Sequence, residues 1–345
     1  MSKKKSSWKH KLAAVLLSCF MMLVVILLAE GFCRLFTRIT FLETTRYLFT
    51  PHRFGPSFGN TPGLEGIAFN EKFNIDNDGF RYEPDFKGTA PADAPAILII
   101  GDSVSFGPGV KENETLAGLL RRAVPDKRIY NASVLGYDTF DYKNVISSVV
   151  AQKPGIKEVI LFYCLNDLSN VSQQIIRQQT EPYENPDLPR DQPTIARRIN
   201  DYLRTRSKLY LWLRSMLYDS SKTYFLNDVS FYQKDDSELK PALQPLADIH
   251  DSLAASGIKF KVFILPYEVQ VRPGAPAEYF AAQQKVEKFL RENNIDYYDA
   301  REDFKKANSP VLLYIFGDPM HLSAAGHRLA AETVCREIEE KCAVR

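Results

Sequence analysis

The 345-residue chain lacks the features that would mark it as disordered, repetitive or rich in disulfides. Its apolar fraction of 45% and charged fraction of 25% are those of an ordinary globular protein, which excludes disorder for most of the chain. No internal repeat is visible. The length is sufficient for one large domain, or for one domain with an appendage.

The chain also lacks a strong net charge. The formal net charge is +2, from 44 basic and 42 acidic residues. Five of the basic residues lie in the first eleven positions, which leaves 39 against 42 acidic residues in the remainder. The body of the protein is therefore slightly acidic, and a nucleic-acid partner is not expected. The five N-terminal residues are Lys3, Lys4, Lys5, Lys9 and Lys11.

Cysteine is scarce, and the five present suggest no paired framework. Cys335 and Cys342 are seven residues apart in a segment with a helical pattern, which would separate them by about 10 Å along a helix. That distance is too long for a disulfide. We therefore expect free thiols, here and at the other three positions, Cys19, Cys33 and Cys164.

Charge is absent from residues 12–29, LAAVLLSCFMMLVVILLA. As a helix these eighteen residues reach about 27 Å, close to the thickness of a bilayer core. The basic tail, residues 1–11, is expected to stay in the cytoplasm, which sends everything after Glu30 across the inner membrane. The alternative is a cleaved signal peptide, because Ala29-Glu30-Gly31 resembles a cleavage site. We favour an uncleaved anchor.

Two further regions follow the apolar stretch. Residues 30–95 form a lead-in punctuated by proline and glycine, in which Asn77-Asp78-Gly79 predicts a tight turn. From residue 96 to residue 345, apolar strands alternate with amphipathic helices. The predicted strands are 97–100, 128–131, 158–163, 259–265 and 296–298, and the predicted helices are 114–123, 140–152, 243–255, 281–292 and 324–340. This alternation favours a parallel sheet of five strands covered by helices on both faces, with ligands at the carboxyl ends of the strands.

The alternation is interrupted at residues 168–240, which we interpret as an insertion that shapes the substrate cleft. Its middle part, RRINDYLRTRSKLYLWLRSMLY from Arg197, interleaves arginine with aromatic and aliphatic residues at helical spacing. Such a helix can lie on a membrane surface. More often it packs on its own domain with the arginines outward, and we favour that interpretation.

Histidine is scarce too, and one of the five has a partner pattern for catalysis. His321 lies just before the last predicted helix, three residues after Asp318. Ser103 follows the first core strand in ILIIGDSVSFG. A serine hydroxyl becomes a nucleophile when a base accepts its proton and a carboxylate orients that base. Ser103, His321 and Asp318 supply those three groups.

Two other strand ends carry residues suited to the same site. Gly136 follows the second core strand, and Asn166 ends the third. A glycine N–H and a carboxamide are donors that stabilise a developing oxyanion. A metal site is not expected, because Asp318 and His327 have no third ligand nearby, and no cofactor is predicted.

These residues resemble the blocks of the SGNH hydrolases, also called GDSL-type esterases and lipases, over roughly residues 96–340. GDSVSFG matches the first block, Gly136 the second, Asn166-Asp167 the third and Asp318-Pro319-Met320-His321 the last. Cys164 stands where the third block usually has glycine. The lead-in IDNDGFRYEP is similar to that of membrane-anchored bacterial members.

The resemblance implies a flavodoxin-like three-layer α/β/α sandwich and a triad of Ser103, His321 and Asp318. It also implies an oxyanion hole formed by Ser103, Gly136 and Asn166. We predict a tethered extracytoplasmic esterase or O-acyltransferase that acts on an acylated small molecule or glycan. Asp102 and Ser105 are expected to shape the turn. The alternative is a non-catalytic SGNH-like module of a surface-polysaccharide apparatus, in which loss of a triad residue would be expected.

Overall fold

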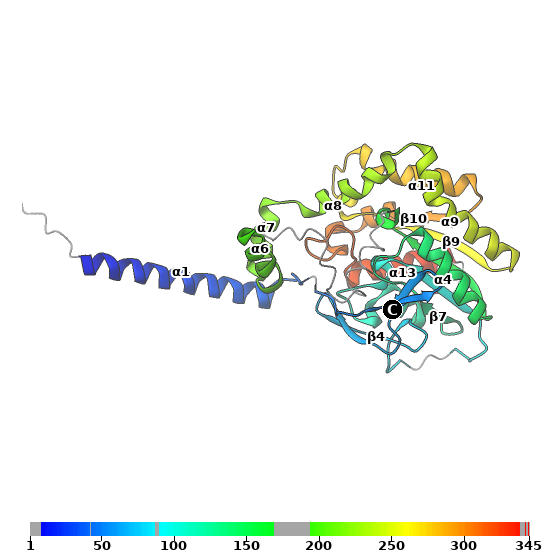
Figure 1. Cartoon of the computed structure of the whole chain (residues 1–345), viewed down its shortest axis with the longest axis horizontal. Helices are drawn as coiled ribbons and strands as arrows, with labels where there is room; N and C mark the ends of the chain where they lie inside the picture. The colour runs from blue at the N-terminus through cyan, green and yellow to red at the C-terminus, as the bar shows by residue number, and fades with distance from the viewer. Residues whose placement is uncertain are drawn as a thin grey trace, which may run out of the picture. The chain divides into compact units, whose positions relative to one another are not determined.

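The computed structural model describes residues 8–41, 43–86, 90–168 and 194–338, together with Cys342 and Val344 (Figure 1). These residues form two compact units. The first unit consists of residues 8–41 and 194–218, and the second contains the other described residues.

The second unit contains a mixed sheet in the order β10-β9-β8-β6-β7-β5-β4-β3. The five strands from β10 to β7 run parallel, as the alternation of strands and helices predicts. β6 lies between β8 and β7, and all six of its residues are buried. The parallel strands are β6 (Ala96–Gly101), β7 (Arg128–Asn131), β8 (Ile156–Tyr163), β9 (Lys259–Ile264) and β10 (Asp296–Asp299).

Helices pack on the sheet in two groups. Helices α3 and α12 pack against α13, whereas α4 and α11 pack against α9. Because crossovers between parallel strands are right-handed, this strand order places the groups on opposite faces. The predicted three-layer arrangement is therefore confirmed. The helices are α3 (Leu116–Ala123), α4 (Thr139–Gln152), α9 (Asp236–Ala255), α11 (Ala281–Glu292), α12 (Arg301–Lys306) and α13 (Ala324–Glu337).

The smaller elements connect these layers. In the described part of the second unit they are short α-helices and 3₁₀ turns. The elements are α8 (Ser220–Val229), α10 (Glu268–Val271), η1 (Glu112–Glu114), η2 (Leu165–Leu168), η3 (Ser230–Gln233), η4 (Ala277–Phe280) and η5 (Pro310–Leu313).

The lead-in adds three strands to the sheet, beyond the five strands that the sequence predicts. β3 (Glu65–Ala68), β4 (Glu71–Ile75) and β5 (Arg81–Tyr82) are antiparallel, and β5 pairs with β7. The predicted turn is present between β4 and β5, where Asp76 accepts from two backbone N–H groups and Gly79 has a φ of +90°. These three lead-in strands thus belong to the same unit as the parallel strands. A separate hairpin contains β1 (Phe49–Phe54) and β2 (Ser57–Asn60).

Arg81 on β5 fixes the lead-in to the loop that follows β6. Its guanidinium is 1% exposed and donates to the carbonyls of Phe106, Gly107 and Val110 at 2.6 to 2.8 Å. Its Nε lies 2.7 Å from the carboxylate of Glu112. A charge buried this deeply is tolerated only when it is paired and hydrogen-bonded, and Arg81 is both.

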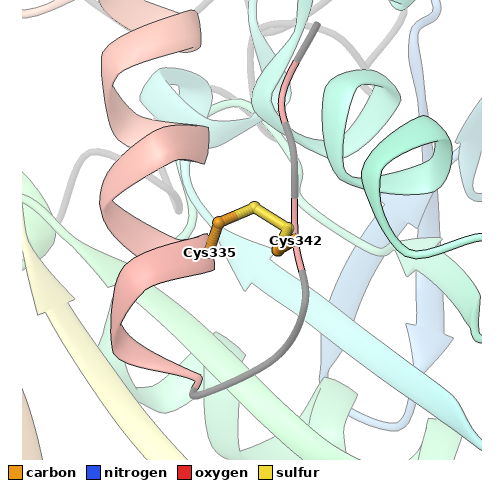
Figure 2. The surroundings of a disulfide bond; sticks show 2 residues. All are labelled: Cys335 and Cys342. Atoms are coloured by element: carbon orange, nitrogen blue, oxygen red, sulfur yellow. A yellow bond between two sulfur atoms is a disulfide. The ribbon is translucent and has the colours of Figure 1, made fainter.

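The C-terminal segment corrects the expectation of free thiols. Helix α13 ends at Glu337, three residues before the predicted end, and the chain then leaves the helical path. Cys342 returns to within 5.2 Å of Cys335, Cα to Cα, and the two form a disulfide (Figure 2). The estimate from helical rise is wrong because the two residues do not share a helix. Cys19, Cys33 and Cys164 are free thiols, as expected.

The first unit contains α1 (Trp8–Phe36), α6 (Ile195–Arg206) and α7 (Lys208–Leu217). Of the described residues, only α1 forms a helix long and apolar enough to cross a membrane, a test that an export signal also passes. Helix α7 packs against α1 and contains no buried residue. This segment therefore belongs to the same unit as α1, and its packing on the second unit stays a prediction.

We predict that Arg81→Met destabilises the second unit by about 3 kcal/mol or more, because it leaves three buried carbonyls without their donor and removes one of the two arginines paired with Glu112. For a domain of this size the midpoint of thermal unfolding falls by roughly 6–12 °C. Circular dichroism of the detergent-solubilised chain measures it. The matched control is Arg122→Met, because Arg122 forms a partly exposed ion pair with Glu83. Equal midpoints for the two variants would contradict the prediction.

Candidate active site

Ser103 is the first residue of the short helix α2 (Ser103–Phe106), directly after β6. Asp102 caps this helix, because its Oδ1 accepts from the N–H of Val104 at 2.8 Å. Strand β6 is buried to its last residue, Gly101, and helix α2 begins two residues later. This abrupt change of direction places the Ser103 side chain at the carboxyl end of the sheet, where ligands bind in folds of this class.

The residues around Ser103 form a turn with little spare room. A Cβ on Gly101 would lie 2.3 Å from Ser105 Oγ and 2.7 Å from the carbonyl oxygen of Phe162, so a larger residue is excluded there. Ser105 Oγ donates to the Asp102 carbonyl and contacts Ser133 Oγ at 2.9 Å. The prediction that Asp102 and Ser105 shape this turn is confirmed.

His321 meets Ser103 across 218 residues of sequence. Its Nε2 lies 2.8 Å from Ser103 Oγ, and its Nδ1 lies 2.7 Å from Asp318 Oδ2. An ionised carboxylate can only accept hydrogen bonds, so the Asp318 contact requires the proton of the neutral imidazole to be on Nδ1. Nε2 is then free of a proton and accepts from Ser103. Ser103 Oγ also lies 3.3 Å from Asp102 Oδ2, but the contact with His321 is the shorter one. The sequence predicts this juxtaposition of three residues, and the structure contains it.

Asp318 holds the loop of His321 as well as its ring. Its second oxygen, Oδ1, accepts from the N–H groups of Met320 at 3.0 Å and His321 at 2.8 Å. The His321 carbonyl accepts from Ile315. One buried carboxylate therefore fixes both the backbone and the tautomer of the histidine.

The charges of this pair stabilise each other. Burial alone raises the pKa of the Asp318 carboxyl, but the imidazolium of His321 and three hydrogen bonds lower it below its usual value. For His321, burial lowers the pKa, and the carboxylate of Asp318 outweighs it and raises the pKa above the usual value. The histidine is therefore a stronger base than a solvated imidazole.

Asn166 lies in η2, directly after β8, and its Nδ2 donates to Asp102 Oδ2 at 2.8 Å. Asp102 therefore contacts both Ser103 and Asn166, and this bridge was not foreseen from the sequence. Burial raises the pKa of the Asp102 carboxyl, and the bond from Asn166 opposes the shift. The structure thus places Asn166 beside the nucleophile turn, as the strand-end pattern predicts.

Gly136 lies in the loop between β7 and α4, with a φ of +84°. Two residues earlier, the N–H of Val134 donates to the carbonyl of Gly101 at 3.2 Å, which fixes the start of this loop beside the end of β6. The left-handed backbone explains why glycine occupies the position. Its role as an oxyanion donor stays a prediction.

Comparison with known proteins identifies the family. Residues 99–329 match the GDSL-like lipase/acylhydrolase family, which is more than half of the chain. The chain belongs to this family. The resemblance inferred from the sequence is thereby confirmed, and family membership supports an ester-cleaving hydrolase. No curated protein matches the chain.

Solved structures similar to this acylhydrolase chain have low identity. They include the acetylxylan esterase Axe2 from Geobacillus stearothermophilus, with 18% identity over 75% of this chain and 100% of that one, at a TM-score of 0.41. The lipase/acylhydrolase from Enterococcus faecalis has 14% identity over 73% and 98%, also at 0.41. A lipolytic G-D-S-L family member from Veillonella parvula DSM 2008 has 12% identity over 71% and 98%, at 0.42.

Phe69 is a residue of the GDSL-like site that was missed from the sequence. It lies with Asn70 in the turn between β3 and β4, and both have positive φ, +51° and +68°. An aromatic residue is unusual in this left-handed region. The Phe69 ring packs edge-on to His321, with the ring centroids 5.1 Å apart at an interplanar angle of 89°. The lead-in sequence predicts a tight turn at Asn77-Asp78-Gly79, and nothing in it indicates a contact between Phe69 and His321.

The predicted insertion contacts the segments of this candidate site at two points. Helix α8 packs against η2, which carries Asn166. Its first residue, Ser220, donates to the carbonyl of Gly317 at 3.1 Å, next to Asp318. Residues 169–193 also belong to the insertion that we expect to shape the substrate cleft, and they lie outside the described residues.

His327, the other histidine of the last block, is part of the core. It is fully buried, and its Nδ1 accepts from the N–H of Leu116 at the start of α3. Burial lowers the pKa of His327 to about 3, with the positive charge of Arg81 contributing. It therefore stays neutral at physiological pH and supports the fold.

We predict that the two histidines titrate far apart. In an imidazole NMR titration, His321 has a pKa above the usual 6.5, whereas His327 gives no titration near neutrality. In Asp318→Asn the charge that raises the pKa of His321 is removed, so the pKa falls below the wild-type value. The control is Asp251→Asn, an exposed acid on α9, which leaves the pKa unchanged. A His321 pKa that is the same in wild type and Asp318→Asn would contradict the assigned contact.

Proposed function

We propose that this protein is a membrane-tethered, extracytoplasmic serine esterase that forms an acyl-enzyme on Ser103. The observation that carries the proposal is the continuous contact from Ser103 Oγ through His321 to Asp318, at 2.8 and 2.7 Å. A base and an orienting carboxylate at these distances are what a serine needs to become nucleophilic. The intact set of three counts against a non-catalytic module.

The first half of the reaction acylates the serine. Ser103 Oγ attacks the carbonyl carbon of an ester while its proton passes to His321 Nε2. The imidazolium that forms is stabilised by Asp318, which stays ionised. His321 then gives the proton to the leaving alcohol, and the C–O bond of the ester breaks.

The negative charge that develops on the carbonyl oxygen needs donors that are already in place. We propose the N–H groups of Ser103 and Gly136 and the carboxamide of Asn166. This assignment is supported by the bond from Asn166 to Asp102, because Asp102 also contacts Ser103. For Gly136, the assignment rests on its match to the second block of the family.

The second half of the reaction releases the acyl group. His321 takes a proton from the acceptor while the acceptor oxygen attacks the acyl carbon. The bond from that carbon to Ser103 Oγ then breaks, and His321 returns the proton to Oγ. With water as the acceptor the reaction is ester hydrolysis. With a sugar hydroxyl the same groups perform O-acyl transfer, so access to the acceptor decides between the two outcomes. We propose acyl esters of an envelope or exported glycan as substrates.

The extracytoplasmic location is supported by two independent features. Lysines precede the uncharged stretch of a helix that is long enough to span a membrane, which favours a location outside the cytoplasm for the residues that follow. The disulfide between Cys335 and Cys342 is of a kind that persists in oxidising compartments and is rare in the cytosol.

We predict that a fluorophosphonate probe labels the wild-type chain and that Ser103→Ala abolishes labelling, because the probe reacts with an activated serine. Ester hydrolysis falls by roughly 10³-fold or more in the same variant. Labelling is measured by in-gel fluorescence and hydrolysis with short-chain aryl esters. The control is Ser252→Ala, an exposed serine on α9.

Equal labelling of wild type and Ser103→Ala would contradict the nucleophile assignment. The acceptor is identified by supplying an acyl donor with and without a glycan and analysing the products by mass spectrometry. Free acid alone supports the esterase, whereas an acylated glycan that depends on Ser103 identifies a transferase.

We predict that the oxidation state of the cysteines identifies the compartment in which the second unit lies. In cells lysed under denaturing conditions without reductant, a mass-adding maleimide modifies three cysteines, because Cys335 and Cys342 are paired. After reduction it modifies all five. The matched control is a chain without residues 8–36, which stays in the cytoplasm and is modified at all its cysteines without reductant. Five modified cysteines in the unreduced full chain would contradict both the disulfide and the oxidising location.

A further inference from the structure

The end of the apolar helix is tied to the α6–α7 pair by one carboxylate. Glu30 directly follows the uncharged stretch of α1. It accepts from the N–H groups of Lys208 at 3.1 Å and Leu209 at 2.9 Å, and from Ser207 Oγ at 2.8 Å. Glu30 therefore satisfies the otherwise unpaired donors at the start of α7 and complements the positive end of its dipole.

Arg34 completes this connection one helical turn later. Its Nε donates to Glu30 at 2.7 Å, and its Nη2 donates to the carbonyl of Arg206 at 2.6 Å. The carbonyl belongs to the last residue of α6, which a helix leaves without an internal partner. The corner between α6 and α7 is thus held on both sides by residues of α1.

The two helices expose a large apolar surface. On α6 the exposed apolar residues recur at helical spacing, and on α7 they form a second stripe. No residue of α7 is buried, and Leu217 is 89% exposed. Helices of a water-soluble domain normally bury such stripes. The exposed residues are Ile195, Ile199, Tyr202, Trp212, Leu213, Met216 and Leu217.

The same segment is strongly basic. Residues 194–218 contain six arginines and lysines and one acid, Asp201. This composition contrasts with the slightly acidic body of the protein. Basic helices with aromatic and aliphatic stripes bind at the surface of anionic membranes, where the apolar face enters the headgroup region and the cations stay near phosphate.

We infer that α6 and α7 lie on the anionic membrane surface at the point where α1 leaves the bilayer, as a lipid-binding platform. The inference rests on the proposed tether and goes beyond it, since a tether needs only α1. The occupant of the exposed surface is the phospholipid interface because this surface is continuous with the end of the membrane helix. Its positive charge is complementary to anionic headgroups.

The two tryptophans of the chain allow the platform and the tether to be tested separately, because Trp8 lies in α1 and Trp212 in α7. The full chain is reconstituted in vesicles of phosphatidylcholine and phosphatidylglycerol. Lipids brominated either near the headgroup or near the middle of the acyl chain quench tryptophan fluorescence by contact. Trp8→Phe isolates Trp212, and Trp212→Phe isolates Trp8.

We predict that headgroup-proximal bromines quench Trp212 by roughly two-fold or more, and more strongly than the deep ones. Quenching of Trp8 shows that α1 is inserted. A quenched Trp8 with an unquenched Trp212 would overturn the platform while the tether stands. An unquenched Trp8 would overturn both. Shielding of Trp212 from bromolipid and from aqueous iodide would identify burial against protein, in a second copy or another partner, and would also overturn the platform.

Charge is tested with a matched pair of triple variants. Arg204→Gln, Lys208→Gln and Arg214→Gln together are expected to reduce quenching of Trp212 by roughly two-fold in vesicles with phosphatidylglycerol. The control combines Lys157→Gln, Lys240→Gln and Lys259→Gln, which removes three exposed cations from the second unit and leaves quenching unchanged. Fluorophosphonate labelling confirms that every variant is folded. Equal quenching in the two triple variants would overturn the role of the cations.

Discussion

The buried guanidinium of Arg81 is the interaction on which the arrangement of the second unit depends. It belongs to a strand of the lead-in, yet its donors bind three carbonyls of the loop that follows Ser103. Because a buried cation is costly unless all its donors are used, the lead-in strands and the nucleophile loop have little freedom to separate. The same strands carry the turn with Phe69, so the lead-in also reaches His321.

Much of the second unit could be predicted from the sequence, because its signals are local. The central strands β6 and β8 contain apolar runs, and the helices that follow the parallel strands have apolar residues at helical spacing. The site follows from topology, since the carboxyl ends of parallel strands meet at one edge and bring Ser103 and Asn166 together. The bond between His321 and Ser103 follows from chemistry, because each of these groups needs the other for acyl transfer.

What the sequence did not reveal depends on contacts between distant segments. β5 is two residues long and has no periodicity, so only its pairing with β7 shows that it belongs to the sheet. The disulfide depends on where α13 ends, and helix ends are the least certain part of a pattern. The basic amphipathic segment has the same composition whether it packs on protein or on lipid. The hydrogen bonds from its helix start to Glu30 place it beside the end of α1, and its contact with lipid stays a proposal.

The strained turn at Phe69 connects the lead-in strands to His321. A non-glycine residue at a φ of +51° costs of order 1 kcal/mol, and the fold retains it through hydrogen bonds from Phe69 N to Glu43 and from Gly109 N to Ala68. The strained turn holds an aromatic ring edge-on against His321. The lead-in therefore contacts the histidine of the candidate triad through Phe69, as well as the loop after the nucleophile through Arg81.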